Sequence, residues 1–404
     1  MIKIKVLLSH PGTQHSMKLA EQLLRKDILF KYVTGFKLYE GCITLKLIIF
    51  FLPRINKKYF SNRVINIRPS LLKTYPSYDV LIKILGIIIK SSNDLYFFAN
   101  RYFQHRVSFK LINKIDVVIG FDTASWILSK GTKTNNKKFI LDLSIAHSVE
   151  MQKTFNYLNK KYPEWIASIP LKKQKYLDFE NAELNNADAI VVASSFTKNT
   201  LLKNGIPNEK IFLNPYGVDI NKFRFNDTRD FSKKLKFVFI GSVTARKGVP
   251  TLLKAWQKIN PKNAELLIIG PIGDKERKLI PNVENIKVLG KIPNDSLPEI
   301  IDDCHIFVFP SYFEGFGLVI LEAMASGLVV ITTDATAGPD IIENRKEGFF
   351  YSAYDENKLV AYIQLCMDNR DLLKSISLAA RKKAESFTWD AYGDRYYNII
   401  NNLD

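Results

Sequence analysis

The sequence predicts an α/β protein built from two Rossmann-like domains, each with a parallel sheet. Short apolar runs alternate along the chain with longer stretches of helical character, which is the pattern of repeated β-α units. The runs are apolar at nearly every position, as expected for strands that helices cover on both faces. We expect strands at Ile2–Leu8, Val117–Phe121, Phe139–Leu143, Ala189–Ala193, Phe237–Ile240, Leu266–Ile269, Ile306–Phe309 and Val329–Thr332.

The boundary between the domains is expected where this alternation pauses. Between Ile211 and Phe231 the chain is polar and aromatic, and a new strand follows. We therefore divide the chain into a first domain at 1–215 and a second domain at 216–388. The tail, 389–404, carries Tyr and Ile residues at helical spacing, and we expect this helix to pack back on the first domain.

Composition favours a cytoplasmic protein. The chain has 404 residues, 47% of them hydrophobic, which is enough for two packed domains. Its longest apolar runs, Leu47–Leu52 and Ile84–Ile89, are far shorter than the about 20 residues of a membrane-spanning helix. The amino-terminal residues lack the apolar core of a signal peptide. Cys42, Cys304 and Cys366 are scattered without metal-ligand spacing, so neither disulfides nor a zinc site are expected.

A formal net charge of +18 calls for an acidic partner, which could be nucleic acid, an anionic membrane surface or a diphosphate substrate. The lysines are spread along the whole chain and no zinc-finger or RNP motif occurs, so nucleic acid is not the expected partner. Codon bias of the source organism is an equally good explanation of part of the lysine excess.

Two stretches, Tyr39–Tyr59 and Val80–Lys90, mix apolar side chains with lysines and arginines. They could lie on a membrane surface as amphipathic segments. The favoured interpretation is that they are ordinary helices that bury an apolar face and leave their lysines in solvent.

The most informative segment runs from Phe309 to Gly327 and predicts a strand, a glycine-bearing loop and a helix. Such a loop lies at the carboxyl end of a parallel strand, where open α/β sheets bind ligands. Its glycines let backbone amides approach a ligand, and the following helix N-terminus favours a phosphate. Glu322 sits about one turn into that helix, and a carboxylate there can accept hydrogen bonds from the vicinal hydroxyls of a ribose.

Glu314, within Pro-Ser-x-x-Glu-Gly-Phe-Gly, and Glu322, with seven residues between the two, resemble the paired glutamates of family-four retaining glycosyltransferases, which belong to glycosyltransferase group 1. The alternative is a generic helix start with an acid favoured by the helix dipole. The resemblance implies a GT-B fold, with two Rossmann-like domains whose parallel sheets face an interdomain cleft. It places Glu314 beside the donor sugar as a catalytic residue. It implies that the backbone of Gly315, Phe316, Gly317 and Leu318 holds the donor diphosphate, and that Glu322 binds the ribose.

The loop Gly241–Gly248 resembles the one in which the family grips the donor diphosphate with Arg and Lys. Lys247 occupies the lysine position, and a Lys-Gly pair after a strand could otherwise be a solvated turn. Ser242 stands where the family usually has arginine, so Arg246 is expected to replace that charge.

Three further matches are weaker. Val288–Ile292 is similar to the turn whose backbone meets the nucleotide base, which implies base binding near Ile292. His147 resembles the family's cleft histidine near the transferred sugar. His10–His15 stands at the family's first glycine loop, so Gly12 and His15 are expected to face the acceptor or donor, although His15 capping the first helix is as good an interpretation.

The resemblance covers about Leu171–Tyr351 and implies a hexosyltransferase-type enzyme. It would move a sugar, with retention, from a nucleotide-diphosphate sugar to a glycan or lipid-linked acceptor, in bacterial surface polysaccharide or lipopolysaccharide synthesis. No Asp-x-Asp pair occurs, so we expect neither a metal nor another cofactor. We expect no nucleic acid partner, and a cytoplasmic location that extends to the inner face of the cytoplasmic membrane. The alternatives are a nucleotide-sugar epimerase or phosphorylase on the same fold, or a noncatalytic basic binding protein.

Overall fold

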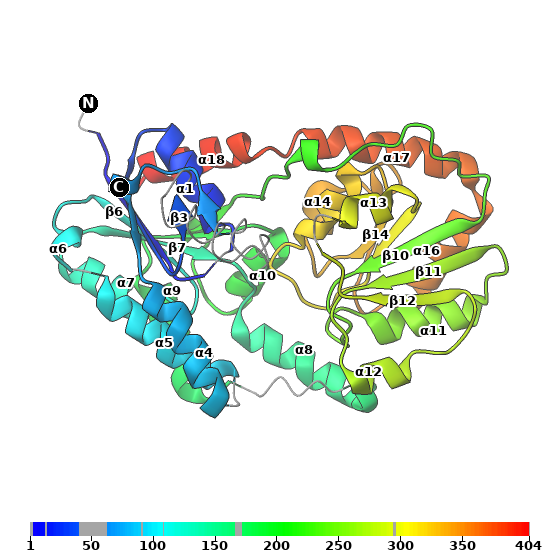
Figure 1. Ribbon diagram of the computed structural model, residues 1–404, viewed down its shortest axis with the longest axis horizontal. Coiled ribbons are helices and arrows are strands. Elements are labelled where there is room, and N and C mark those ends of the chain that lie inside the picture. The colour runs from blue at the N-terminus through cyan, green and yellow to red at the C-terminus, as the bar shows by residue number, and fades with distance from the viewer. Residues whose placement is uncertain are drawn as a thin grey trace, which may run out of the picture.

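The computed structural model describes residues 3–12, 14–39, 63–89, 92–107, 109–165, 172–293 and 296–403. These residues form two lobes, each built around a parallel sheet, and the second lobe follows the first along the chain (Figure 1). The fold class predicted from the sequence is confirmed. Of the cysteines, Cys304 and Cys366 are buried free thiols, whereas Cys42 lies outside the described residues.

The first lobe contains a seven-stranded sheet in the order β5-β2-β1-β6-β7-β8-β9. All of its strand pairs are parallel. Its strands are β1 (Val6–His10), β2 (Leu29–Thr34), β5 (Leu72–Thr74), β6 (Val117–Phe121), β7 (Lys138–Leu143), β8 (Ala189–Val192) and β9 (Ile211–Leu213), with a separate small pair, β3 (Leu38–Tyr39) and β4 (Val64–Ile65).

The second lobe contains a six-stranded parallel sheet in the order β12-β11-β10-β13-β14-β15. Each run predicted as a strand in either domain forms one, although the first begins at Val6 instead of Ile2. The predicted strands do not include β2, β3, β4, β5, β9, β12 and β15. The strands of this sheet are β10 (Leu235–Ile240), β11 (Ala264–Ile269), β12 (Ile286–Gly290), β13 (Ile306–Phe309), β14 (Val329–Thr333) and β15 (Gly348–Tyr351).

Helices connect successive strands and cover the sheets, which buries the apolar runs that predicted them. The helices of the first lobe are α1 (Ser16–Arg25), α4 (Pro76–Ile88), α5 (Ser92–Arg106), α6 (Phe109–Ile112), α7 (Trp126–Thr134), α8 (Ser148–Lys161), α9 (Gln174–Asn186) and α10 (Ser195–Lys203). Those that follow β10 are α11 (Val249–Ile259), α12 (Asp274–Leu279), α13 (Leu297–Asp302), α14 (Leu318–Ala325), α15 (Gly338–Ile341), α16 (Glu356–Asp368), α17 (Arg370–Glu385) and α18 (Trp389–Asn401).

Two helices link the lobes in addition to the segment between β9 and β10. After α17, the chain returns along one edge of the molecule, and α18 lies against α1 of the first lobe (Figure 1). Nε2 of Gln22 donates to Oδ1 of Asp390 at 3.0 Å in this contact. On the opposite side, α8 leaves the first lobe after β7, and its far end reaches α11 and α16 of the second lobe.

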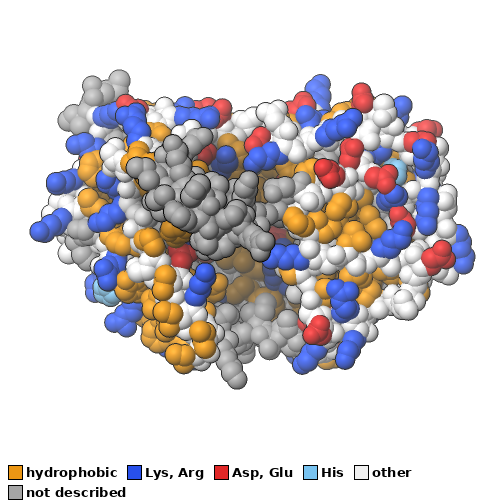
Figure 2. Space-filling view, in the orientation of Figure 1, with side chains coloured by type: hydrophobic (Ala, Val, Ile, Leu, Met, Phe, Trp, Pro, Cys, Tyr) orange, Lys and Arg blue, Asp and Glu red, His pale blue; other side chains and the backbone are white. Residues whose placement is uncertain are grey.

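One helix departs from the sequence-based interpretation. The segment Val80–Lys90 falls mostly in α4, but its apolar stripe is exposed: Val80 54%, Ile84 54%, Ile87 84% and Ile88 75%. These positions share one helical face. The expectation that this segment buries an apolar face therefore holds only in part: Ile82 packs against the core of the first lobe, whereas the stripe stays exposed. Figure 2 shows hydrophobic side chains gathered on the surface at α4. Nearly all of Tyr39–Tyr59 lies outside the described residues.

No helix in the described part of the chain has the length and apolar character needed to cross a membrane.

Candidate active site

The loop between β13 and α14 carries the glutamate motif and touches the other domain. A side chain at Gly315 would place its Cβ 1.9 Å from the carbonyl oxygen of Ser144, so only glycine allows this approach. The Gly315 carbonyl accepts hydrogen bonds from Oγ of Ser194, at 2.5 Å, and from Oγ1 of Thr197, at 3.1 Å. Gly317, with φ +87°, forms the N-cap of α14. The first domain therefore holds the loop directly.

The loop between β10 and α11 lies beside the glutamate loop in the same domain. A Cβ at Gly248, where φ is +74°, would lie 1.9 Å from the carbonyl oxygen of Pro310. The backbone amide of Tyr312 donates to the Arg246 carbonyl at 2.8 Å. Because β10 and β13 are neighbours in the parallel sheet, their carboxyl ends bring both loops to one edge.

Glu314 forms ion pairs with the two basic side chains of the loop between β10 and α11. Its Oε1 accepts from Nη1 of Arg246 at 3.0 Å, from Oγ of Ser311 at 2.6 Å and from Nζ of Lys247. Glu314 is only 8% exposed. Burial lowers the pKa of Lys247, with Glu314 acting in the opposite direction, and the ammonium also lies 4.9 Å from the ring centre of Phe309. Residues predicted for two separate roles thus form one ionic cluster.

Glu322 and Ile292, the residues expected to bind the nucleoside, come from two different parts of the second domain. Glu322 is half-buried in α14, and burial raises the pKa of its carboxyl, while Lys222 acts to lower it. Ile292 follows β12, at the far edge of the sheet. β11 and β10 separate β12 from β13, so the ends that precede Ile292 and Glu314 are about 14 Å apart at the usual strand spacing.

His15 is buried in the interface between the domains. It occupies the N-cap of α1, but its ring does not cap the helix. Instead Nε2 lies 2.9 Å from Oδ1 of Asp142, and the ring packs at a tilt against Tyr216, with the ring centres 4.3 Å apart. Tyr216 in turn packs at a tilt against Phe316 of the glutamate loop, with the ring centres 5.1 Å apart. The capping interpretation is wrong, and the predicted contact with a substrate stays a prediction.

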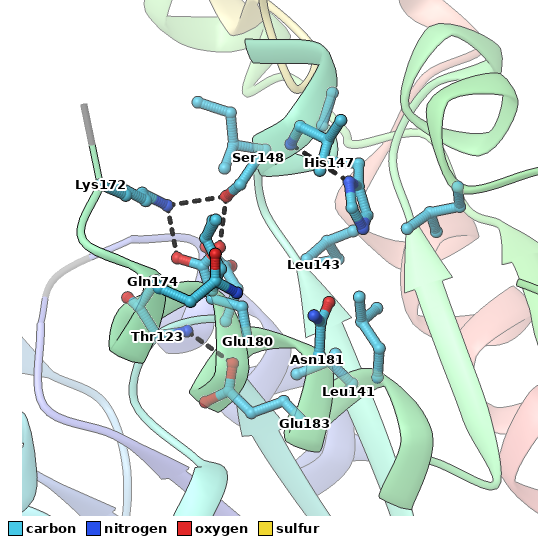
Figure 3. Close-up of a pocket in the computed structure, with 17 residues that line it drawn as sticks. Thr123, Leu141, Leu143, His147, Ser148, Lys172, Gln174, Glu180, Asn181 and Glu183 are labelled. Atoms are coloured by element: carbon cyan, nitrogen blue, oxygen red, sulfur yellow. Dashed lines mark hydrogen bonds and ion pairs between the residues drawn. The ribbon is translucent and has the colours of Figure 1, made fainter. Parts of the chain in front are cut away.

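His147 precedes α8 and lines a cavity of about 210 Å³ between α8, α9 and β7 (Figure 3). Its Nδ1 accepts from the backbone amide of Val149 at 3.3 Å, and burial lowers its pKa. Lys172 donates to Oγ of Ser148 at 2.8 Å in the same cavity and pairs with Glu180. The sequence analysis did not single out these three polar residues.

The same cavity has a buried acid that was also missed. Glu183 accepts from the backbone amides of Thr123, at 2.8 Å, and Ser125, at 2.6 Å, and burial raises its pKa well above the usual value. These bonds fix the turn after β6. No sequence motif marks Glu183, because its partners lie about sixty residues earlier.

Gly12 lines a second cavity, of about 440 Å³, in the first domain. This cavity adjoins the first, since both are lined by Asp122, Thr123, Ile145, Lys172 and Glu180. Aromatic side chains from α5, α7 and α9 form much of its wall. Nothing in the sequence marks them as neighbours.

In the described ranges, no group of three or more His, Cys, Asp or Glu side chains could hold a metal ion.

Comparison with known proteins identifies the domain that carries the ionic cluster. Residues 221–383 match the model of the family described as glycosyl transferases group 1. The match contains both glutamates, Arg246 and Lys247.

Among relatives, a Salmonella typhimurium protein assigned to colanic acid biosynthesis, the glycosyltransferase WcaL, is 23% identical over 309 residues, which cover 70% of this chain and 76% of the relative. The amylovoran biosynthesis glycosyltransferase AmsK of Erwinia amylovora is 25% identical over 213 residues, covering 49% of this chain and 52% of the relative. The capsular polysaccharide biosynthesis glycosyltransferase CapM of Staphylococcus aureus is 26% identical over 241 residues, covering 54% and 63%. The chain therefore spans between about half and three quarters of these relatives.

Solved structures extend the likeness over the whole chain. A sucrose-phosphate synthase from Thermosynechococcus elongatus aligns with a TM-score of 0.68, 18% identity and 99% coverage of both chains. Anabaena HepE in complex with UDP aligns with a TM-score of 0.65, 15% identity, and coverage of 98% of this chain and 100% of that one. With the two parallel sheets, these alignments show that the chain has the GT-B fold, and residues 221–383 resemble the group 1 glycosyl transferases.

Proposed function

We propose that this protein is a retaining glycosyltransferase that moves a hexose from a nucleotide-diphosphate sugar to a glycan or lipid-linked acceptor in bacterial surface polysaccharide synthesis. The observation that carries the proposal is the cluster of Glu314, Arg246 and Lys247, where two glycine loops meet beside the other domain. The relatives named for colanic acid, amylovoran and capsular polysaccharide biosynthesis support the setting.

Breaking the bond between the anomeric carbon and the diphosphate requires stabilisation of the charge that grows on the leaving group. Lys247, Arg246 and the backbone amides of 315–318 would supply it, and one such donor is typically worth about 3 kcal/mol of barrier. No metal or other cofactor is required in this scheme. The nucleoside diphosphate leaves as the acceptor hydroxyl forms its bond to the anomeric carbon, and the hydroxyl proton passes to a leaving phosphate oxygen.

The same cluster gives Glu314 a second task. An arriving diphosphate competes for both cations, which releases the carboxylate from its ion pairs. Glu314 would then accept hydrogen bonds from donor-sugar hydroxyls or stabilise positive charge at the anomeric carbon. Glu322 would bind the ribose and the backbone near Ile292 the base. His147 would face the transferred sugar, and Gly12 and His15 would line the meeting point with the acceptor.

The exposed stripe on α4 supports association with the inner face of the cytoplasmic membrane. Val80, Ile84, Ile87 and Ile88 present apolar surface, and Arg101 and Arg106 of the adjoining α5 are exposed. Apolar insertion combined with basic side chains suits an anionic bilayer surface, where each Lys or Arg contributes about 1 kcal/mol.

The proposal is tested with a panel of nucleotide sugars. Thermal unfolding identifies the donor, because a ligand that binds only the folded state raises its stability by about 2.7 kcal/mol at a hundredfold excess over Kd. NMR of the product then reads the anomeric configuration, which we expect to be retained. Conversion of the donor to its epimer without an acceptor would point to an epimerase, and dependence on inorganic phosphate would point to a phosphorylase. Failure of every nucleotide sugar to bind would refute the proposal.

A further inference from the structure

The larger cavity of the first domain has an aromatic wall. The ring of Phe97, from α5, stacks on Trp126 of α7 at 5.4 Å with an interplanar angle of 10°. It also stacks on Phe179 of α9 at 5.2 Å, and Trp126 and Phe179 lie 5.2 Å apart. Three elements thus bring their aromatic side chains to one wall of a cavity of about 440 Å³, which is within the range of small-molecule sites.

One end of this cavity reaches the donor site. Pro11, Gly12 and Ile145 line it there. Cα of Ile145 lies 3.1 Å from the position that a Cβ on Gly315 would take, so the lining abuts the loop that follows Glu314. A hydroxyl held at this end would be beside the donor loop.

The other end lies in the hairpin of α4 and α5, which pack on each other. Tyr78 of α4 and Tyr96 of α5 line the cavity, and Tyr96 is 51% exposed. The outer side of the same hairpin carries the exposed stripe of α4 (Figure 2). Apolar surface therefore extends from the outside of the molecule into a cavity that ends at the donor loop.

We propose that the acceptor is lipid-linked and that this cavity holds its sugar head group, with the lipid leaving past Tyr96 towards the α4 stripe; the inference rests on the proposed function. A sugar ring packs the C–H groups of one face on an aromatic wall, while Asp122, Lys172 and Glu180 provide polar atoms for its hydroxyls. A water-soluble glycan would leave the apolar rim and the stripe uncovered. The lipid part of the acceptor, and not its sugar alone, therefore decides how well an acceptor is used.

The test uses the donor that the nucleotide-sugar panel selects, in radiolabelled form. The full chain is incubated with the membranes of its source organism or with the aqueous fraction of the same cells, and the label is partitioned between butanol and water. We expect butanol-extractable label from the membranes and at least tenfold less product from the aqueous fraction. Label confined to water-soluble product would overturn the proposal.

Two variants link the result to the cavity. Tyr96→Ser alters the rim, and we expect at least a tenfold loss of lipid-extractable product. Leu378→Ser removes an equally exposed apolar side chain, 51%, from α17 of the second domain and should retain wild-type transfer. The nucleotide-induced rise in Tm reports the donor site of each variant separately. Equal product from both variants would contradict the cavity assignment. A wild-type chain that shows no rise with any nucleotide sugar would instead refute the proposed function, and this inference with it.

Discussion

Nη1 of Arg246 lies 3.0 Å from Oε1 of Glu314, so a cation expected to hold the donor diphosphate is paired with the residue expected to face the donor sugar. Lys247 shares the same oxygen. Within this site, the glutamate and the diphosphate would compete for the same two cations, and donor binding would exchange one anion for another.

Replacement of Glu314 by glutamine separates its competition for the two cations from its role at the anomeric carbon. Glu314→Gln removes the competing charge, so the nucleoside diphosphate selected by the panel should bind at least as tightly as in the wild type. Transfer should fall by at least a hundredfold, because the amide cannot offset positive charge at the anomeric carbon. Calorimetric titration and rate measurements on the same preparation check both. Weaker nucleotide binding by Glu314→Gln would argue against the competition.

We expect the buried carboxyl of Glu322 to lower the stability of the fold at neutral pH while it contributes to nucleotide binding. Burial raises the pKa of its carboxyl, so between the usual value and the raised one the folded state binds more protons than the unfolded state. Stability therefore falls as pH rises through that window. Glu322→Gln should raise Tm at pH 7, lose this advantage near pH 4, and weaken nucleotide binding. Unfolding curves at both pH values test the first part, and an unchanged nucleotide affinity would exclude the ribose role.

Tyr162, at the end of α8, forms hydrogen bonds to the second domain. Its buried hydroxyl lies 2.9 Å from Oγ1 of Thr251 and also contacts Glu356, which pairs with Lys161 at 2.9 Å. Tyr162→Phe removes the bonds to Thr251 and to the charged Glu356, although Thr251 keeps Tyr312 as a partner and Glu356 keeps Lys161. We expect a loss of about 2 kcal/mol in the free energy of unfolding. Tyr102→Phe breaks an exposed bond to Ser77 and should cost less than about 0.5 kcal/mol. Similar denaturant midpoints for both variants would show that α8 is not held this way.

The α4 stripe predicts reversible binding to membranes. Ile87→Ser and Ile88→Ser remove two exposed apolar side chains that make little contact with the fold. The double variant should lose most of its sedimentation with anionic phospholipid vesicles, while its stability changes by less than about 0.5 kcal/mol. Leu378→Ser serves as the control and should sediment like the wild type. Undiminished sedimentation of the double variant would remove α4 from the membrane contact.

The sequence was most informative where one continuous segment forms the local structure and also carries the candidate site residues. From Phe309 to Glu322, strand, loop and helix follow in order, so local pattern alone predicts the position of the motif. Most of the strands missed are short or lie at sheet edges, as with β5 and β15, where apolar runs are brief and propensity is weak. The exception is β2, which has six residues and lies inside its sheet.

The acceptor side was not predictable in this way. Phe97, Trp126 and Phe179 meet only through the packing of α5, α7 and α9, and no spacing in the sequence encodes such long-range contacts. The stripe of α4 had the right period, but periodicity cannot tell which face a neighbouring element will cover. His15 stands at the N-cap of α1, but its side chain bonds to Asp142, which is 127 residues away, instead of capping the helix.

If the cations of the Gly241–Gly248 loop drive the departure of a nucleoside diphosphate, Lys247→Ala should remove most of the transfer activity. We measure sugar transfer from the donor selected by the panel, with circular dichroism as the check on folding and Lys233→Ala, an exposed lysine nearby in sequence, as the control. We expect a folded Lys247→Ala protein whose transfer is at least a hundredfold below that of the wild type and of Lys233→Ala. A folded Lys247→Ala protein that transfers sugar at the wild-type rate would contradict this role of the cations.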